Sequence, residues 1–194
     1  MRKLAPLLAV AIAAPLLSGC FGLAATGIGA AAMMVDDRRT TGVYIEDENI
    51  EWKAVAKLIS DFKGSHVNAT SFNRKVLLTG EVSTEDTKKA VEEAVKSIPS
   101  VRDVANELAI AGDSSIASRG NDSIITTNVK ARMVGNGKFS TNHVKVVTEA
   151  GTVFLMGLVT QAEGDAAVEI ARSTSGVARV VKVFEYVPGT PKRN

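Results

Sequence analysis

"VLLTGEVS" at 76–83 and "VFLMGLVT" at 153–160 are two versions of one short segment. Each sets a run of apolar and β-branched residues around one glycine, Gly80 or Gly157. Such runs predict a buried strand. A glycine towards the end of a strand predicts that a helix or a neighbouring backbone comes close at that point. The repetition indicates that the chain builds the same small unit twice.

The match between the two copies extends well beyond this strand. Gly80 and Gly157 are 77 positions apart, and so are His66 and His143. Upstream, Ile50 and Val55 match Ile124 and Val129 at a spacing of 74. Downstream, "SVRDVANEL" (100–108) matches "GVARVVKVF" (176–184). An internal repeat therefore covers nearly the whole chain after its N-terminal leader.

Each copy follows the same predicted order of elements. Apolar residues at helical spacing in 47–62 and 121–134 predict a first helix, with Asn49 and Asp122 as expected N-caps. Two strands joined by a tight turn, a second helix and a last strand follow. We expect an α+β fold of two tandem αββαβ units, each a small mixed sheet packed on two helices. Trp52, in the first copy, is expected to pack in the core or between the units.

The chain begins with the features of an exported protein. Arg2 and Lys3 precede an uncharged apolar stretch from Leu4 to Leu17, which has the length of a signal-peptide core. Leu17-Ser18-Gly19-Cys20 then resembles the cleavage box of bacterial lipoproteins, and Cys20 is the only cysteine. The resemblance implies that Cys20 becomes a lipidated N-terminus. Two alternatives stay open: an ordinary secretory signal with an incidental cysteine, and a membrane-spanning anchor interrupted by proline and glycine.

The predicted organisation follows from this leader. By the sorting rule of such lipoproteins, Phe21 after the cysteine implies a lipid anchor in the outer membrane, facing the periplasm. We expect five segments: a signal peptide over 1–19, a lipidated cysteine and tether over 20–46, a first domain over 47–111, a second domain over 120–187, and a tail over 188–194.

Composition argues against several classes of function. Lys plus Arg is 23 and Asp plus Glu is 21, so removal of Arg2 and Lys3 leaves 21 of each. A neutral chain with few aromatic residues does not favour nucleic-acid binding. The two histidines have no second ligand at metal spacing, and no nucleophile motif is present. We therefore expect no enzyme, no catalytic residue, no cofactor, no metal site and no small-molecule substrate.

The repeat resembles the BON domain, most closely in "HVKVVTEAGTVFLMGLVT" and "SGVARVV" of the second copy. Two such units after a lipobox resemble the dual-BON-domain outer-membrane lipoproteins. That resemblance implies a protein that supports envelope integrity, gathers at division sites, influences outer-membrane protein assembly, and binds anionic phospholipid through the first helix of its second BON domain. The matching positions in this chain are Ile124, Val129, Lys130 and Val134.

The pattern of this helix leaves room for other interpretations. Ile125, Val129 and Met133 share one predicted face, the natural core stripe, while Ile124 and Val134 lie elsewhere with Lys130 beside them. Ile124 and Val134 are expected either to face lipid or to pack against the first domain. Similar proteins carry tryptophan where this chain has Ile124, which lacks the interfacial preference of an indole. A protein-binding adaptor, with an envelope protein as partner and membrane contact only through Cys20, is the alternative function.

Overall fold

The computed structural model describes residues 36–112 and 116–189. The predicted signal peptide, Cys20, most of the tether and the end of the tail lie outside the described residues. Arg38–Asn194 forms one compact unit. Within the described ranges, no helix combines the length and the apolar character needed to cross a bilayer.

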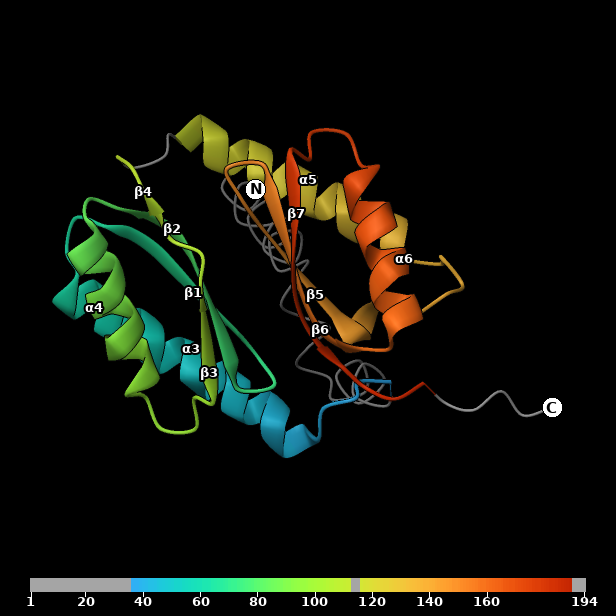
Figure 1. Cartoon of the computed structure of the whole chain (residues 1–194), viewed down its shortest axis with the longest axis horizontal. Helices are drawn as coiled ribbons and strands as arrows, with labels where there is room; N and C mark the ends of the chain where they lie inside the picture. Colours follow the sequence, from blue (N-terminus) through green and yellow to red (C-terminus); the bar gives the residue numbers. More distant parts are fainter. Residues whose placement is uncertain (1–35, 113–115, 190–194) are drawn as a thin grey trace, which may run out of the picture. The chain divides into compact units, whose positions relative to one another are not determined.

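The first repeat contains two helices and a small mixed sheet (Figure 1). The antiparallel hairpin of β1 and β2 pairs in parallel with the split last strand, β3 and β4, through β2. Helices α3 and α4 supply side chains to the core that covers one face of this sheet. The elements are α3 (Thr41–Asp61), β1 (His66–Phe72), β2 (Lys75–Val82), α4 (Glu85–Lys96), β3 (Asp103–Asn106) and β4 (Ala109–Ile110).

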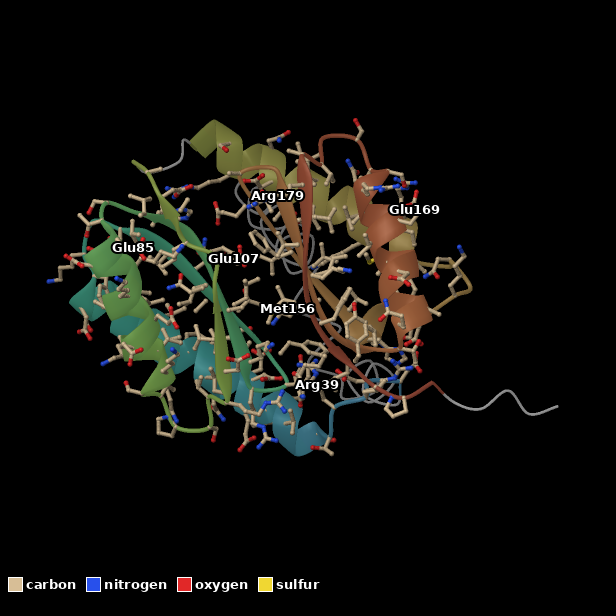
Figure 2. All side chains as sticks on the ribbon, viewed as in Figure 1. Arg39, Glu85, Glu107, Met156, Glu169 and Arg179 are labelled. Atoms are coloured by element: carbon tan, nitrogen blue, oxygen red, sulfur yellow. The ribbon has the colours of Figure 1, made fainter. Side chains whose placement is uncertain are left out.

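The second repeat has the same plan, with β6 between antiparallel β5 and parallel β7. The predicted α+β fold of two αββαβ units with mixed sheets is confirmed. Charged side chains such as Glu169 lie on the outer surface of α6, as Figure 2 shows. The elements are α5 (Ile116–Met133), a 3₁₀ turn (Thr141–His143), β5 (Val144–Glu149), β6 (Thr152–Val159), α6 (Gln161–Arg172) and β7 (Arg179–Tyr186).

The central strand of each sheet is buried on both faces, which explains its continuous apolar run. Alternate residues point to the helices of the same repeat: Val76, Leu78 and Val82 in β2, and Val153, Leu155 and Val159 in β6. Between them, Leu77 of β2 and Phe154 and Met156 of β6 point to the opposite faces. There they form a third cluster with Phe72 of β1 and Val183 of β7. The two repeats therefore share an apolar core in addition to their own.

Gly80 and Gly157 are required by close backbone contact, as predicted. A Cβ atom on Gly80 would lie 2.0 Å from the carbonyl oxygen of His66, and one on Gly157 would lie 2.3 Å from that of His143. Real Cβ atoms do not approach backbone so closely. Each glycine thus lets the backbone of the first hairpin strand come unusually close to the second. The close approach lies next to the residue that pairs with the glycine, Val67 or Val144.

The first helices begin earlier than the sequence predicts. Helix α3 begins at Thr41, with Thr40 as its N-cap. Helix α5 begins at Ile116. Asn49 and Asp122 therefore lie inside helices, and the prediction that they cap them is wrong.

Asp122 instead connects its helix to the hairpin turn of the same repeat. Its carboxylate accepts hydrogen bonds from the backbone N–H groups of Ala150 (2.9 Å) and Gly151 (2.8 Å). Asp47 does the same in the first repeat, accepting from the N–H groups of Asn73 (2.8 Å) and Arg74 (2.7 Å). Both aspartates are buried. The equivalence of Asp47 and Asp122 shows that the first helices align at a spacing of 75, which pairs buried Ile50 with buried Ile125, rather than at 74.

Substitution of Gly157 by alanine tests the close strand crossing. Gly157→Ala should lower the free energy of unfolding by about 1–3 kcal/mol, because the backbone must shift to admit the methyl group. Gly120→Ala is the matched control, since Gly120 lies in α5 with nothing within 4 Å of the new Cβ. It should leave stability unchanged or raise it by up to about 1 kcal/mol. Urea unfolding measures both, and equal stability of the two variants would contradict the account.

Candidate functional site

Helix α5 and the residue that directly follows it, Val134, expose two large apolar side chains. Ile124 and Val134 retain 61% and 68% of their accessible surface. Lys130 is exposed on the same helix and makes no ion pair with any other described residue. The buried side of α5 is filled by Ile125, Val129 and Met133. The expectation that Ile124 and Val134 pack against the first domain is contradicted by their exposure.

Val129 does not belong to this surface. Its side chain is completely buried in the core of the second repeat, where it contacts other apolar residues rather than anything outside the fold. This corrects the assignment of Val129 as a lipid-contacting residue. Its contribution is to hold α5 on the sheet, so that Ile124, Lys130 and Val134 stay on the outside.

Trp52 is the residue that sequence reasoning placed least well. It lies on α3 with 73% of its surface exposed, so the expectation that it packs in the core or between the units is wrong. Ile59 is exposed to a similar extent, at 69%. The buried face of α3 is occupied instead by Ile50, Ala54 and Leu58. The first helix of each repeat therefore displays apolar side chains outwards.

Two consecutive arginines just before α3 hold the end of the tether against the folded unit. Arg38 makes two hydrogen bonds to the Glu163 carboxylate, at 2.6 and 2.9 Å, and a third to the carbonyl oxygen of Leu158. Arg39 forms an ion pair with Asp47 at 2.8 Å and stacks over the Phe72 ring at 3.9 Å. The tether is thereby fixed to the second repeat by one arginine and to the first repeat by the next.

Glu163 carries a strongly perturbed carboxyl group. The Arg38 guanidinium lowers the pKa of Glu163 from 4.5 to about 2, with help from the backbone N–H and side chain of Thr160. Glu163 also completes a capping box with Thr160 at the start of α6. The Glu163 carboxylate therefore both binds Arg38 at the end of the tether and caps the start of α6.

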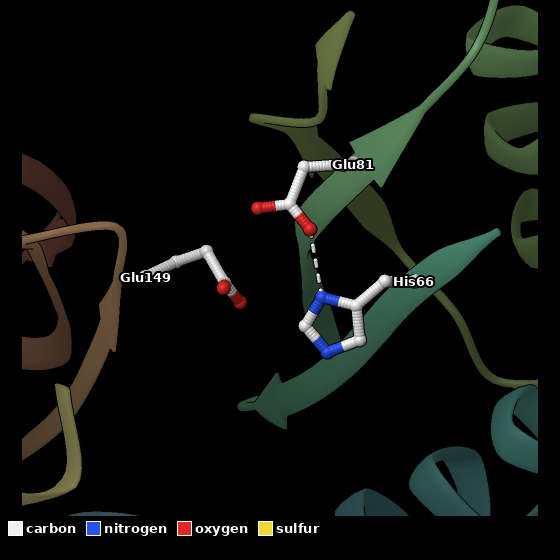
Figure 3. A group of neighbouring side chains, drawn as sticks. All are labelled: His66, Glu81 and Glu149. Carbon is white, nitrogen blue, oxygen red and sulfur yellow. Dashed lines mark hydrogen bonds and ion pairs between the residues drawn. The ribbon is translucent and has the colours of Figure 1, made fainter. Parts of the chain in front are cut away.

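A polar cluster offers the ligand types that a metal ion uses. Atoms of His66, Glu81 and Glu149 that can ligate a metal all lie within 4.8 Å of one another (Figure 3). His66 Nδ1 is 2.8 Å from Glu81 Oε2, and Asn68 donates to Glu149 at 3.1 Å. Burial raises the pKa of the Glu149 carboxyl, and the nearby Glu81 charge adds to this. Zinc is bound by these ligand types at about 2.0–2.2 Å, so a zinc ion between His66 Nδ1 and Glu81 would replace their hydrogen bond.

The cluster borders an open cavity of about 500 Å³, lined mainly by polar side chains. Sequence spacing could not reveal this group, because its members come from three different strands. Residues that line the cavity include His66, Asn68, Asp122, Thr126 and Glu149.

The Arg38–Glu163 contact predicts a pH-dependent contribution to stability. Because folding lowers the pKa of Glu163, its contribution is present above about pH 4.5 and is lost as the pH falls towards about 2. Glu163→Gln should lower the free energy of unfolding by about 1–2 kcal/mol at pH 7, after allowance for solvent screening. Thermal unfolding of both proteins from pH 7 to pH 2 should show the difference shrinking. A difference in melting temperature that is constant across this range would contradict the assignment.

The chain is similar to several characterised sequences. The BON domain model matches residues 46–112 and 121–188. Outer membrane lipoprotein DolP of Haemophilus influenzae is 40% identical over 190 residues, covering 96% of this chain and 97% of that protein. The 21 kDa hemolysin of Actinobacillus pleuropneumoniae is 32% identical, over 78% and 79% of the two chains. Osmotically-inducible protein Y of Escherichia coli is 28% identical, over 72% of each. The chain belongs to the BON-domain family, with two BON domains in tandem.

Proposed function

We propose that this chain is a non-enzymatic outer-membrane lipoprotein, facing the periplasm, that binds anionic phospholipid through its second BON domain. By this binding it maintains the integrity of the outer membrane, including at division sites. The name of its relative from Haemophilus influenzae, an outer membrane lipoprotein, supports the location. The lipobox-like sequence that ends at Cys20 supports an acyl anchor.

The exposure of Ile124 and Val134 near Lys130, which pairs with no acidic group among the described residues, is the observation that carries the proposal. Apolar side chains on an amphipathic helix enter the boundary between headgroups and acyl chains. A lysine near an anionic membrane surface contributes about 1 kcal/mol of attraction. Helix α5 can present apolar side chains and a lysine to a membrane while it stays packed on the sheet. Its core face is filled by other residues, Ile125, Val129 and Met133.

The acyl anchor and helix α5 have different tasks in this proposal. Buried methylenes of an acyl chain contribute about 0.8 kcal/mol each and hold the protein on a membrane without regard to headgroup charge. Lys130 makes the second contact sensitive to anionic lipid. The anchor therefore keeps the protein on the membrane, and α5 gives it a preference for regions rich in anionic lipid.

The proposal is tested by co-sedimentation of residues 21–194, which lack the anchor, with vesicles. Vesicles of phosphatidylcholine alone are compared with vesicles that also contain phosphatidylglycerol, and the measured quantity is the extra binding caused by the anionic lipid. Ile124→Glu and Lys130→Glu should each reduce that extra binding about tenfold, because a carboxylate introduced near an anionic surface costs about 1–2 kcal/mol.

The matched control is Ile110→Glu, since Ile110 is exposed to a similar extent (54%) but lies on β4 of the first repeat. It should bind as the unsubstituted protein does. If the anionic lipid adds no binding, or if all three variants lose it equally, the lipid site on α5 is rejected. The adaptor alternative, with a protein partner at Ile124 and Val134, would then be favoured.

A further inference from the structure

The largest concentration of exposed apolar side chains lies on α3 of the first repeat rather than on α5. Of the nine large hydrophobic residues exposed in the described part of the chain, five belong to this one helix. Helix α5 contributes Ile124, and Val134 follows directly after that helix. The five on α3 are Tyr44, Ile45, Trp52, Val55 and Ile59.

Three of these residues form a straight row. Ile45, Trp52 and Ile59 are seven residues apart, which is close to two helical turns, so they lie above one another along α3. Val55 lies next to these three residues, one turn before Ile59. Since the opposite face of α3 is already packed on its own sheet, the row is not needed to complete the fold. We call Ile45, Trp52, Val55 and Ile59 the α3 row.

The charges around the α3 row are largely neutralised. Most acidic residues of α3 pair with a basic partner: Glu46 with Arg74 (3.7 Å), Asp47 with Arg39 (2.8 Å), Glu51 with Lys145 (2.6 Å) and Asp61 with Lys57 (3.3 Å). Glu48 is exposed beside the row, and Lys53 and Lys63 form no ion pair with other described residues. The surface is apolar and almost neutral, unlike that of α5.

We propose that the α3 row is a second membrane-contact surface, which enters the interfacial layer of the bilayer with Trp52 at its centre and does so regardless of lipid charge. Tryptophan is the side chain with the strongest preference for this layer, because its indole is apolar and its N–H still finds a polar partner. Isoleucine on either side adds apolar area that is removed from water. Neutral surroundings make anionic lipid unnecessary.

A membrane fits this surface better than a protein partner does. Glu48 lies on the same side of α3 as Ile45 and Trp52. In a protein–protein contact its carboxylate would need a basic or donor group on the partner, because burying it unpaired is costly. At a membrane interface the same carboxylate stays among hydrated headgroups while the apolar neighbours go deeper.

The position of α3 in the chain adds to this argument, and this step rests on the proposed anchor at Cys20. Helix α3 begins at Thr41 and is the first helix in the described part of the chain. A fully extended chain reaches at most about 3.6 Å per residue, which keeps Thr41 within roughly 76 Å of the anchor. The tether thus keeps the α3 row within reach of the membrane surface.

Trp52 is the only tryptophan in the chain, so its fluorescence reports directly on the α3 row. Residues 21–194 are mixed with vesicles of phosphatidylcholine alone. The emission maximum should shift to shorter wavelength, and lipids brominated on the acyl chain should quench the emission. Trp52→Glu and Ile59→Glu should each weaken co-sedimentation with these neutral vesicles about tenfold, which corresponds to about 1.4 kcal/mol.

Two controls separate this site from the one on α5. Ile124→Glu should keep the full spectral shift with neutral vesicles even though it loses the extra binding to anionic ones. Ile110→Glu should behave as the unsubstituted protein does. An emission spectrum that neutral vesicles leave unchanged, with binding unaffected by Trp52→Glu, would overturn the proposal. A shift that appears without vesicles as protein concentration rises would also overturn it, because it would assign the α3 row to a second copy of the chain.

Discussion

In both repeats, a buried aspartate joins the first helix to the turn of the hairpin beneath it. Asp47 and Asp122 each accept two backbone N–H groups from such a turn. Both turns have their two central residues in the left-handed region, as type I′ hairpin turns require. A buried carboxylate without these donors would be costly, so the contact fixes both the height and the rotation of the helix. The rotation decides which side chains face the core and which face outwards.

The same aspartate contact fixes two helices whose outward surfaces differ. With the rotation fixed, Ile50, Ala54 and Leu58 fill the core under α3, and Ile125, Val129 and Met133 fill it under α5. The outward positions are then free to differ. On α5 and at Val134 just after it, they combine apolar residues with a cation. On α3 they form an apolar row around a tryptophan, with Glu48 on the same side. Duplication of one small unit therefore yields two proposed membrane contacts with different requirements for lipid charge.

Local patterns predicted the parts of this fold that depend on short-range chemistry. Alternation in β2 and β6, and the glycines at 80 and 157, followed from side-chain period and backbone space. The role of Asp122 did not, because an aspartate early in a helical pattern is typical of an N-cap, whereas its partners lie in a turn far along the chain.

The outward face of α3 could have been predicted more fully than it was. Trp52 lies two positions after Ile50, which turns it about 200° away from the core side of the helix. Ile59 and Ile45 lie on the same side, so a helical projection of 41–61 contains the row. The cluster of His66, Glu81 and Glu149 was beyond reach, since three strands must first be placed in register before these residues meet.

Site-directed spin labelling tests most directly whether the outward faces of the first helices meet the membrane. Because Cys20 is the only cysteine, residues 21–194 contain none, and single cysteines can be introduced at Ile45, Ile59, Ile124 and Val134, with Ile110 as the control. On anionic vesicles, labels at the four helix positions should gain access to oxygen dissolved in the bilayer and lose access to a water-soluble relaxation agent, while the label at Ile110 stays in water. Labels on α3 and α5 that remain in water while the protein is bound would contradict the account.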